Sequence, residues 1–278
     1  MKITRKLRNS RGVALLIVLL VTTLLVAFIF EFAYGTRVSV NAAMNYRDSQ
    51  RAYYLARSAV GYVWWNLENM PDSIPHNEWH VIPIISAGDT EVRVRWEDEG
   101  GKINVSTVGS NDTDLLGWLS QLFFDLGIDQ EVLNVMKDPE HQKFEMLSEL
   151  HLIMSDEDYA KTEKYFTMHS NLDNQVNVDT APYEVLRSLL GFRGKDEGLA
   201  EDIVNERANG PITAARLAEL ELGDMTTYLQ TADSKADINE KKVSKVHSFV
   251  TIGEYTKQIE AIIEWGRGQF TIKYWRAM

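Results

Sequence analysis

The most pronounced pattern in the sequence is an apolar run near the amino terminus that becomes amphipathic. Residues 13–30 contain no charged residue, proline or glycine. Beyond Gly35, apolar residues recur every three or four positions, and the first proline is Pro71, a spacing typical of a helix. The pattern predicts one helix over residues 13–69, about 85 Å long at 1.5 Å per residue, with Gly35 and Gly61 as the points where it could bend.

A stripe of small and aliphatic side chains runs along the amphipathic part of this helix. An amphipathic helix presents such a stripe to another helix. We therefore predict that partner helices cover these residues, which are Ala52, Ala56, Ala59, Val63 and Leu67.

After Pro71 the pattern changes to short strands. In residues 90–98, Val92, Val94 and Trp96 alternate with charged residues, which predicts a strand with one buried face. Residues 80–85 form a weaker strand signal, and further strands are predicted over 245–253, 257–265 and 269–275, the last two joined by a glycine-containing turn. We expect the aromatic pairs Trp64–Trp65 and Tyr274–Trp275 in the core between helix and sheet.

Helical patterns occupy the chain between these strand groups. Two starts carry helix-start signals: Ser155 precedes three acidic residues, and Thr180 precedes Pro182. The predicted helices cover 111–127, 129–136, 148–154, 155–169, 180–191, 198–210 and 213–221. The prediction is an α+β fold in which a large all-α domain, with a helix-hairpin-helix-like segment, is inserted into a small antiparallel sheet packed on a long helix.

Charge divides the chain into a basic leader and an acidic body. The net charge is −11, and five basic residues among the first 11 leave −16 on the rest. The acidic body should repel nucleic acid, and the hairpin segment carries Asp196 and Glu197, so we predict no nucleic-acid partner.

The apolar run has the length of a membrane span. Residues 13–30 would cover about 27 Å as a helix, close to the ~30 Å hydrocarbon core. The basic leader favours a cytoplasmic amino terminus and an exported body. A secretory signal cleaved after Ala33-Tyr34-Gly35 is the alternative, although its apolar region would be longer than the usual ~7–15 residues.

Signals for catalysis are missing from the sequence. There is no cysteine, the six histidines are scattered, and no nucleophile or phosphate-loop motif occurs. The acidic groups Asp112 with Asp114 and Asp156–Asp158 fit the first turns of helices. We predict a protein without enzymatic activity, a catalytic residue or a metal-ligand motif.

Three segments carry a resemblance to a known family. They are "RGVALLIVLLVTTLL" at the anchor, "DEGGKINV" at 98–105 and "SELHLIM...NVDTAPYEVLRSLLGF" within 148–192. The chain resembles the minor pseudopilin K family of the type II secretion system, also called general secretion pathway protein K. The resemblance runs from Arg11 to the carboxyl-terminal strands.

The resemblance implies processing at the start of the apolar run. Gly12 would precede the cut made by prepilin peptidase, and Val13 would become the methylated amino terminus. The fifth residue after the cut is Ile17, where most pilin-like proteins have a glutamate that pairs with the amine of the next subunit outward. A subunit with no outward neighbour has no such amine, and a lone buried carboxylate is costly.

The resemblance also implies location and partners. The protein would be a single-pass inner-membrane protein of the Gram-negative envelope with a periplasmic body, capping the tip of the pseudopilus and initiating its assembly. Its partners would be other minor pseudopilins and the pseudopilus, with the outer-membrane secretin and the cargo as further candidates. The implied divisions are 1–12 leader, 13–35 transmembrane half-helix, 36–109 amphipathic helix and first sheet part, 110–229 helical domain and 230–278 final strands.

The chain departs from the family pattern in two places. The family's "INLN" is Ile103, Asn104, Val105 and Ser106 here, and the acidic loop associated with calcium is short, with Asp138, Glu140 and Glu145. Calcium, which needs ~6–8 converging oxygens, is the one cofactor that the resemblance allows. A minor pilin of a type IV pilus and a signal-anchored exported binding protein or enzyme remain alternatives.

Overall fold

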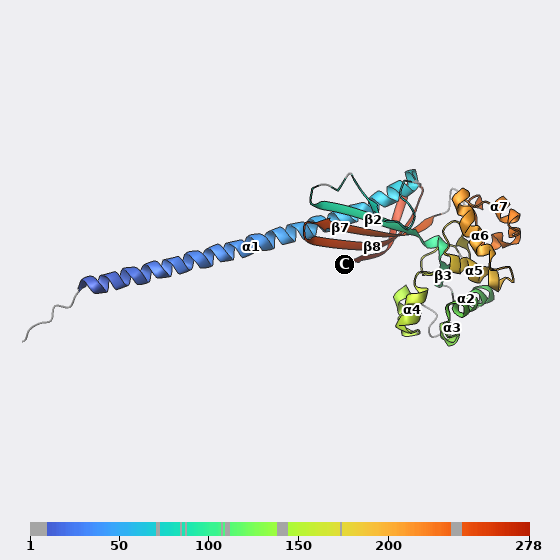
Figure 1. Ribbon diagram of the computed structural model, residues 1–278, viewed down its shortest axis with the longest axis horizontal. Coiled ribbons are helices and arrows are strands. Elements are labelled where there is room, and N and C mark those ends of the chain that lie inside the picture. The colour runs from blue at the N-terminus through green and yellow to red at the C-terminus, as the bar shows by residue number, and fades with distance from the viewer. Residues whose placement is uncertain are drawn as a thin grey trace, which may run out of the picture.

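The computed structural model describes residues 10–70, 73–83, 85–86, 88–106, 108, 112–137, 144–172, 174–234 and 241–278. Its parts lie in a row: a projecting helix, a sheet against the end of that helix, and a group of helices beyond the sheet (Figure 1). Most of the predicted leader, 1–9, lies outside the described residues.

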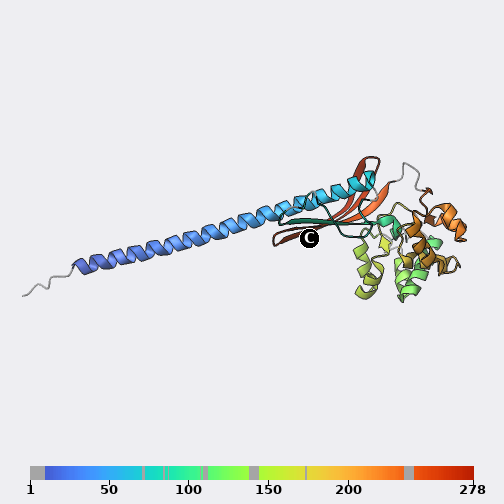
Figure 2. The same ribbon diagram turned by 45° about the horizontal axis from the view of Figure 1, so that its top comes forward.

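A single helix forms the first part of the chain. α1 runs from Ser10 to Asn69 and continues through Gly35 and Gly61, which confirms the predicted long helix. Thr22 and Thr23 donate their hydroxyls back to carbonyl oxygens of the preceding turn, so the polar groups of the apolar half are satisfied within the helix. Its second half, from about residue 47 to Asn69, lies along the sheet and is called the far half. Its first half, up to about residue 46, extends beyond the sheet and is called the near half (Figure 2).

The sheet is antiparallel and joins distant segments of the chain. Its strand order is β1-β2-β7-β8-β9, and β2 pairs with β7 although Val94 and its partner Ser248 are 154 residues apart in the sequence. A bulge interrupts the β8 and β9 pairing between Ile262 and Ile263. The strands are β1 (His80–Val81), β2 (Thr90–Asp98), β7 (Lys242–Ile252), β8 (Tyr255–Gly266) and β9 (Gln269–Ala277).

A mainly helical region is inserted between β2 and β7. Its α-helices are α2 (Thr113–Leu126), α3 (Glu131–Met136), α4 (Asp156–Thr162), α5 (Tyr183–Phe192), α6 (Leu199–Glu206) and α7 (Ala214–Glu219). Its 3-10 helices are η1 (Glu99–Gly101), η2 (Leu147–Leu152), η3 (Arg207–Asn209) and η4 (Gly223–Thr227).

The sequence predicted an all-α inserted region, but the structure shows short strands in it as well. Two short parallel pairs join β3 (Ile103–Asn104) to β4 (Phe166–Thr167) and β5 (Val176–Asn177) to β6 (Leu229–Gln230). The helix predicted over 155–169 therefore ends at Thr162, because the segment after it pairs with β3. Residues 147–152 form a 3-10 helix where an α-helix was expected.

Two separate hydrophobic cores hold these parts together. The sheet core contains α1 alanines and inward side chains of the strands such as Val94 and Val250. The helical core contains Trp118, Phe123 and Phe166, and it also takes in Ile103 and Val105. The sequence analysis placed the start of the helical domain at residue 110. Because Ile103 and Val105 belong to the helical core, this core begins earlier in the chain.

Two helix starts test the capping predictions. Ser155 accepts the backbone N–H of Asp158 at 3.1 Å, which confirms it as the cap of α4. The prediction that Thr180 caps α5 is wrong. The residue at the N-cap position is Pro182, which makes no side-chain hydrogen bond to the helix. Thr180 instead donates its hydroxyl to Asp98 of β2 at 2.7 Å.

Candidate functional site

The near half of α1 is an apolar surface that no other described part of the chain covers. Every residue from Gly12 to Arg47 is exposed, including Leu20 at 65% and Phe30 at 71%. This helix is long and apolar enough to cross a membrane. A helix that is apolar all round requires lipid or other protein around it, so the arrangement is compatible with a single-pass anchor.

The three residues tied to processing lie on this exposed segment. A Cβ built on Gly12 would meet nothing within 4 Å. Val13 is 53% exposed and Ile17 is 59% exposed, so neither is covered by another described part of the chain. Cleavage after Gly12, methylation of Val13 and the missing glutamate's role remain predictions.

The predicted partner stripe on the far half of α1 is already covered. Ala52, Ala56, Ala59 and Val63 are completely buried, and Leu67 is 4% exposed. They pack on the chain's own sheet, in the same core as its inward-facing valines and isoleucines. The prediction that partner helices cover these five residues is therefore wrong, because the small side chains let the helix lie closely on the sheet instead.

The opposite side of the same half carries a different stripe. At 3.6 residues per turn, one solvent-facing line contains Arg47, Arg51, Tyr54, Ser58, Gly61 and Trp65. Tyr54 is 60% exposed and Trp65 is 47% exposed, and the space beside Gly61 is open within 4 Å. We call this line the outer stripe. Sequence reasoning passed over it because the alanine stripe had the cleaner apolar spacing.

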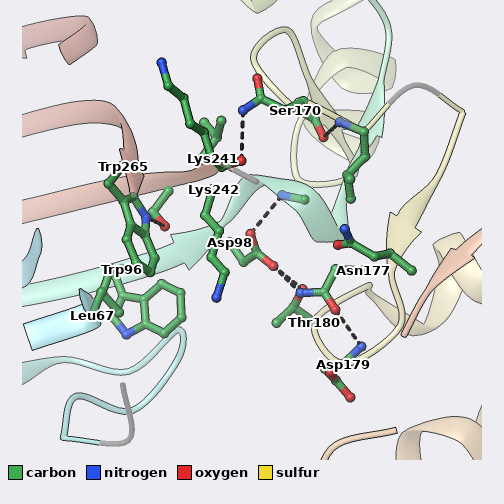
Figure 3. A pocket seen from close by; sticks show the side chains of 16 residues that line it. Leu67, Trp96, Asp98, Ser170, Asn177, Asp179, Thr180, Lys241, Lys242 and Trp265 are labelled. Carbon is green, nitrogen blue, oxygen red and sulfur yellow. Dashed lines mark hydrogen bonds between the residues drawn. The ribbon is translucent and has the colours of Figure 1, made fainter. Parts of the chain in front are cut away.

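Asp98, at the end of β2, joins the sheet to the helical region. Its carboxylate accepts the hydroxyl of Thr180 at 2.7 Å, the side-chain amide of Asn177 at 2.5 Å and the backbone N–H of Gly100 at 3.0 Å. Figure 3 shows these groups converging. Two of the segments that carry the family resemblance, 98–105 and 177–192, thus meet at one carboxylate, which the sequence alone did not reveal.

Gly101 and Asn104 strengthen this junction. A Cβ on Gly101 would lie 2.8 Å from backbone atoms of Thr180, so only glycine fits there. Asn104 donates to the carbonyl oxygen of Ser170 at 3.0 Å and accepts the N–H of Ser106 at 3.0 Å. These contacts hold the segment after β2 against residues 170–180.

A buried ion network lies on the sheet face turned away from α1. The Lys102 ammonium is 2.6 Å from Glu99 and 3.1 Å from Glu97, and His247 lies 3.5 Å from Glu97. Burial alone would raise the pKa of Glu97, but His247 and Lys102 hold it well below its ordinary value. Burial opposes the charge of Lys102, whereas Glu99 and Glu97 raise its pKa overall. The Lys102 ammonium thus neutralises two carboxylates, whereas the buried Nε2 atom of His247 has no hydrogen-bond partner among the described residues.

A cavity of about 170 Å³ remains where α1, the sheet and the helical region meet. Trp96, Trp265 and Leu67 form part of its wall, and Asp98 and Thr180 lie at its polar side (Figure 3). No sequence signal indicated it, because its lining is spread over seven separate segments between Leu67 and Trp265.

The acidic groups have structural partners. Asp112 caps α2, and its pKa is lowered chiefly by the backbone N–H of Leu115. Asp114 accepts from Arg193 at 2.6 Å and from the Tyr228 hydroxyl at 2.9 Å. The interpretation of Asp112 as a helix-start residue is confirmed.

The hairpin between α5 and α6 pairs its cations internally. Arg187 contacts Glu197 at 2.7 Å, and Lys195 contacts Asp224 at 2.8 Å. This pairing reduces the positive charge available for phosphate, and the absence of a nucleic-acid partner stays a prediction.

The proposed calcium loop is only partly visible. Asp138 and Glu140 lie outside the described residues, and Glu145 donates its backbone N–H to Glu149 at 2.9 Å. Within the part of the chain that the structure describes, no group of three or more His, Asp or Glu side chains could hold a metal ion. Calcium binding remains an untested expectation.

The aromatic pairs divide between core and surface. Trp64 and Trp275 pack against the sheet core, and Trp64 contacts Phe270 with ring centroids 4.6 Å apart. Trp65 is exposed, so its predicted core position is wrong. Tyr274 borders a cleft between the sheet and α4.

Comparison with known proteins bears on the fold. No family model matches the sequence, and no match is found among curated proteins. Among solved structures, a chain of the GspK-GspI-GspJ complex from the Type 2 Secretion System of enterotoxigenic Escherichia coli is similar, with a TM-score of 0.56 and 11% sequence identity. The similarity covers 86% of this chain and 99% of that chain. At this identity the likeness defines the fold, so the predicted α+β architecture of a long helix, an antiparallel sheet and further helices is confirmed.

Proposed function

We propose that the chain is a minor pseudopilin of a type II secretion system. The observation that carries the proposal is the fold likeness to a chain of the GspK-GspI-GspJ complex over 99% of that chain. The three resembling sequence segments support it independently, since two of them build the junction at Asp98. In this proposal the protein acts as a structural subunit.

The proposed working location is the inner membrane with a periplasmic body. The exposed apolar half of α1 supports a single span, and the basic leader in the sequence supports a cytoplasmic amino terminus. Prepilin peptidase cuts after Gly12, and Val13 becomes the methylated terminus. Amino-terminal sequencing of the mature protein tests this step: a start at Val13 is expected, and a start at Thr36 would indicate an ordinary secretory signal.

Within the pseudopilus, the subunit occupies the tip and initiates assembly. Ile17 offers no carboxylate to the amine of an outward neighbour, and the helical region at the far end of the sheet is too bulky to repeat along a tightly wound filament (Figure 1). End labelling by a tag is expected, and regular labelling along the shaft would overturn the tip assignment. The secretin and the cargo are proposed as contacts of this exposed end.

Other minor pseudopilins contact the near half of α1 and the outer stripe. Support comes from the exposed Tyr54 and Trp65, because aromatic side chains dominate protein interfaces. The chain has no cysteine, so single cysteines give clean cross-linking. Ser58→Cys should capture pilin-like subunits in cells, whereas the matched Ala56→Cys, buried under the sheet, should not.

Export separates this function from the alternatives. Deleting the gene should abolish secretion of folded proteins across the outer membrane and leave pilus-dependent motility intact. Loss of motility with normal secretion would instead assign the protein to a type IV pilus. Normal secretion and motility would favour a signal-anchored binding protein or enzyme.

A further inference from the structure

The cavity at the junction has walls that are mainly apolar. Its volume is about 170 Å³, and its apolar lining comes from the end of α1, β2, the helical region, β7 and β8. Two indole rings face it (Figure 3). The apolar lining residues are Leu67, Trp96, Leu172, Val243 and Trp265.

Polar groups at the cavity wall already have partners within the chain. The Asp98 carboxylate accepts three hydrogen bonds. The Trp265 indole N–H donates to the Ser244 hydroxyl at 2.9 Å, and the Trp96 indole N–H donates to the carbonyl oxygen of Ile74 at 2.9 Å. Among the described residues, no lining side chain has a buried polar atom without a partner. The lining also includes the charged residues Asp179, Lys241 and Lys242, and the Lys242 ammonium lies 5.3 Å from the centroid of the Trp265 ring. The apolar part of the wall offers few hydrogen bonds to water.

A cavity of this character favours a particular guest. A water molecule needs about two to four polar partners, and apolar cavities of ~150 Å³ stay dry and accept benzene. Aromatic rings gain further from the faces and edges of neighbouring indoles. We propose that this cavity binds a neutral aromatic ring of about the size of benzene, carried by a free small molecule or by a side chain.

An occupant would tie the two cores together. The cavity lies beside the Asp98 contacts with Asn177 and Thr180, and its lining includes both sheet residues and helical-region residues. A ligand that binds only the folded junction stabilises it in proportion to its concentration. The site therefore couples ring binding to the rigidity of the connection between the sheet and the helical region.

Methyl NMR of the full chain in lipid nanodiscs tests the proposal. Fluorobenzene should give saturable shifts of the Leu67, Leu172 and Val243 methyl groups and leave Leu119, in the helical core, unchanged. Cyclohexane should need at least a tenfold higher concentration to half-saturate the shifts of the same methyl groups. N-acetyl-phenylalanine amide is titrated in parallel: saturation by it shows that a side chain can enter, and saturation by fluorobenzene alone restricts the site to free molecules.

Filling the cavity provides the control. Val243→Phe and Leu67→Phe should each abolish the fluorobenzene shifts at the remaining lining methyl groups. The matched change Val81→Phe, at a position 41% exposed, should leave them intact. Near-ultraviolet circular dichroism identifies any variant that misfolds. If one of the two filling variants misfolds, the other one tests whether filling the cavity abolishes binding. The absence of saturable shifts in the wild type, equal binding of cyclohexane, or unchanged binding in a folded filling variant would overturn the proposal.

Discussion

The two halves of α1 are equally helical but differ in what surrounds them. In the near half, large aliphatic side chains point in every direction, and all are exposed. In the far half, Ala52, Ala56 and Ala59 are completely buried on the sheet, and the other side of the helix faces solvent. One continuous helix therefore contains a segment that needs an external partner and a segment that has an internal one.

The difference shows that side-chain size, more than hydrophobicity, decides which half of α1 packs on the sheet. Alanine contributes little area to bury, but it permits a close approach to the valines and isoleucines of the strands. Leucine and phenylalanine around the whole circumference expose more apolar surface than one sheet face could cover. The far half is therefore completed by folding, whereas the near half awaits lipid or other helices.

The largest effect is expected from a charge placed under the far half. Ala56→Asp buries a carboxylate against the sheet without a partner and should lower the free energy of unfolding by at least about 3 kcal/mol. Denaturant unfolding followed by tryptophan fluorescence measures the loss. Ser58→Asp, two residues away on the outer stripe, should change it by less than about 0.5 kcal/mol. Equal losses in both variants would contradict the assignment of the two sides.

A charge in the near half should act on insertion and spare folding. Leu20→Arg should cost about 2.5–3.5 kcal/mol of membrane insertion and leave unfolding of the sheet and helical regions unchanged. Membrane fractionation and unfolding measurements on the same variant separate these quantities. Leu152→Arg, at a position 82% exposed in the helical region, serves as the control and should fractionate like the wild type. A destabilised body in Leu20→Arg would show that the near half also supports the fold.

The sequence predicted the long helix, the main strands and most helices, because period and length define them locally. It did not predict which α1 stripe is buried, since period alone says only that one face is apolar. The sequence also did not predict the contacts of Asp98 with Asn177 and Thr180, because these residues lie up to 82 residues apart in the chain. Short strands such as β4 were missed because their pairing with β3 overrides a helical local pattern.

The comparison extends to the two faces of the sheet under the far half of α1. The face toward α1 is apolar, whereas the other carries Glu97 between Lys102 and His247. The pKa of Glu97 is depressed in the folded state. The ionised carboxylate therefore contributes fully to the free energy of unfolding above about pH 4.3, the ordinary pKa of a glutamate, and this contribution is lost as the pH falls below that value. Glu97→Gln should reduce stability at pH 7 by about 1–3 kcal/mol.

The pH dependence distinguishes this effect from simple loss of packing. The stability gap between wild type and Glu97→Gln should narrow steadily between pH 5 and pH 3, as measured by denaturant unfolding at each pH. Val94→Ala, on the face toward α1, removes no titratable group and should keep a constant gap from the wild type. A gap for Glu97→Gln that is independent of pH would show that the ion network does not hold this carboxyl ionised.

The smallest effect on stability, and the sharpest test of the outer stripe, is expected from Trp65→Ala. Trp65 is 47% exposed, so its removal should change the free energy of unfolding by less than about 0.5 kcal/mol. If the outer stripe contacts another subunit, the same change should reduce capture from Ser58→Cys at least fivefold, because exposed aromatic residues at interfaces often contribute ~1–2 kcal/mol or more to binding. The control is Trp79→Ala, a residue 46% exposed in the loop before β1, which should leave capture unchanged. Equal capture in the Trp65→Ala and wild-type backgrounds would mean that the far half of α1 is satisfied by its own sheet alone, and that assembly contacts are confined to the near half.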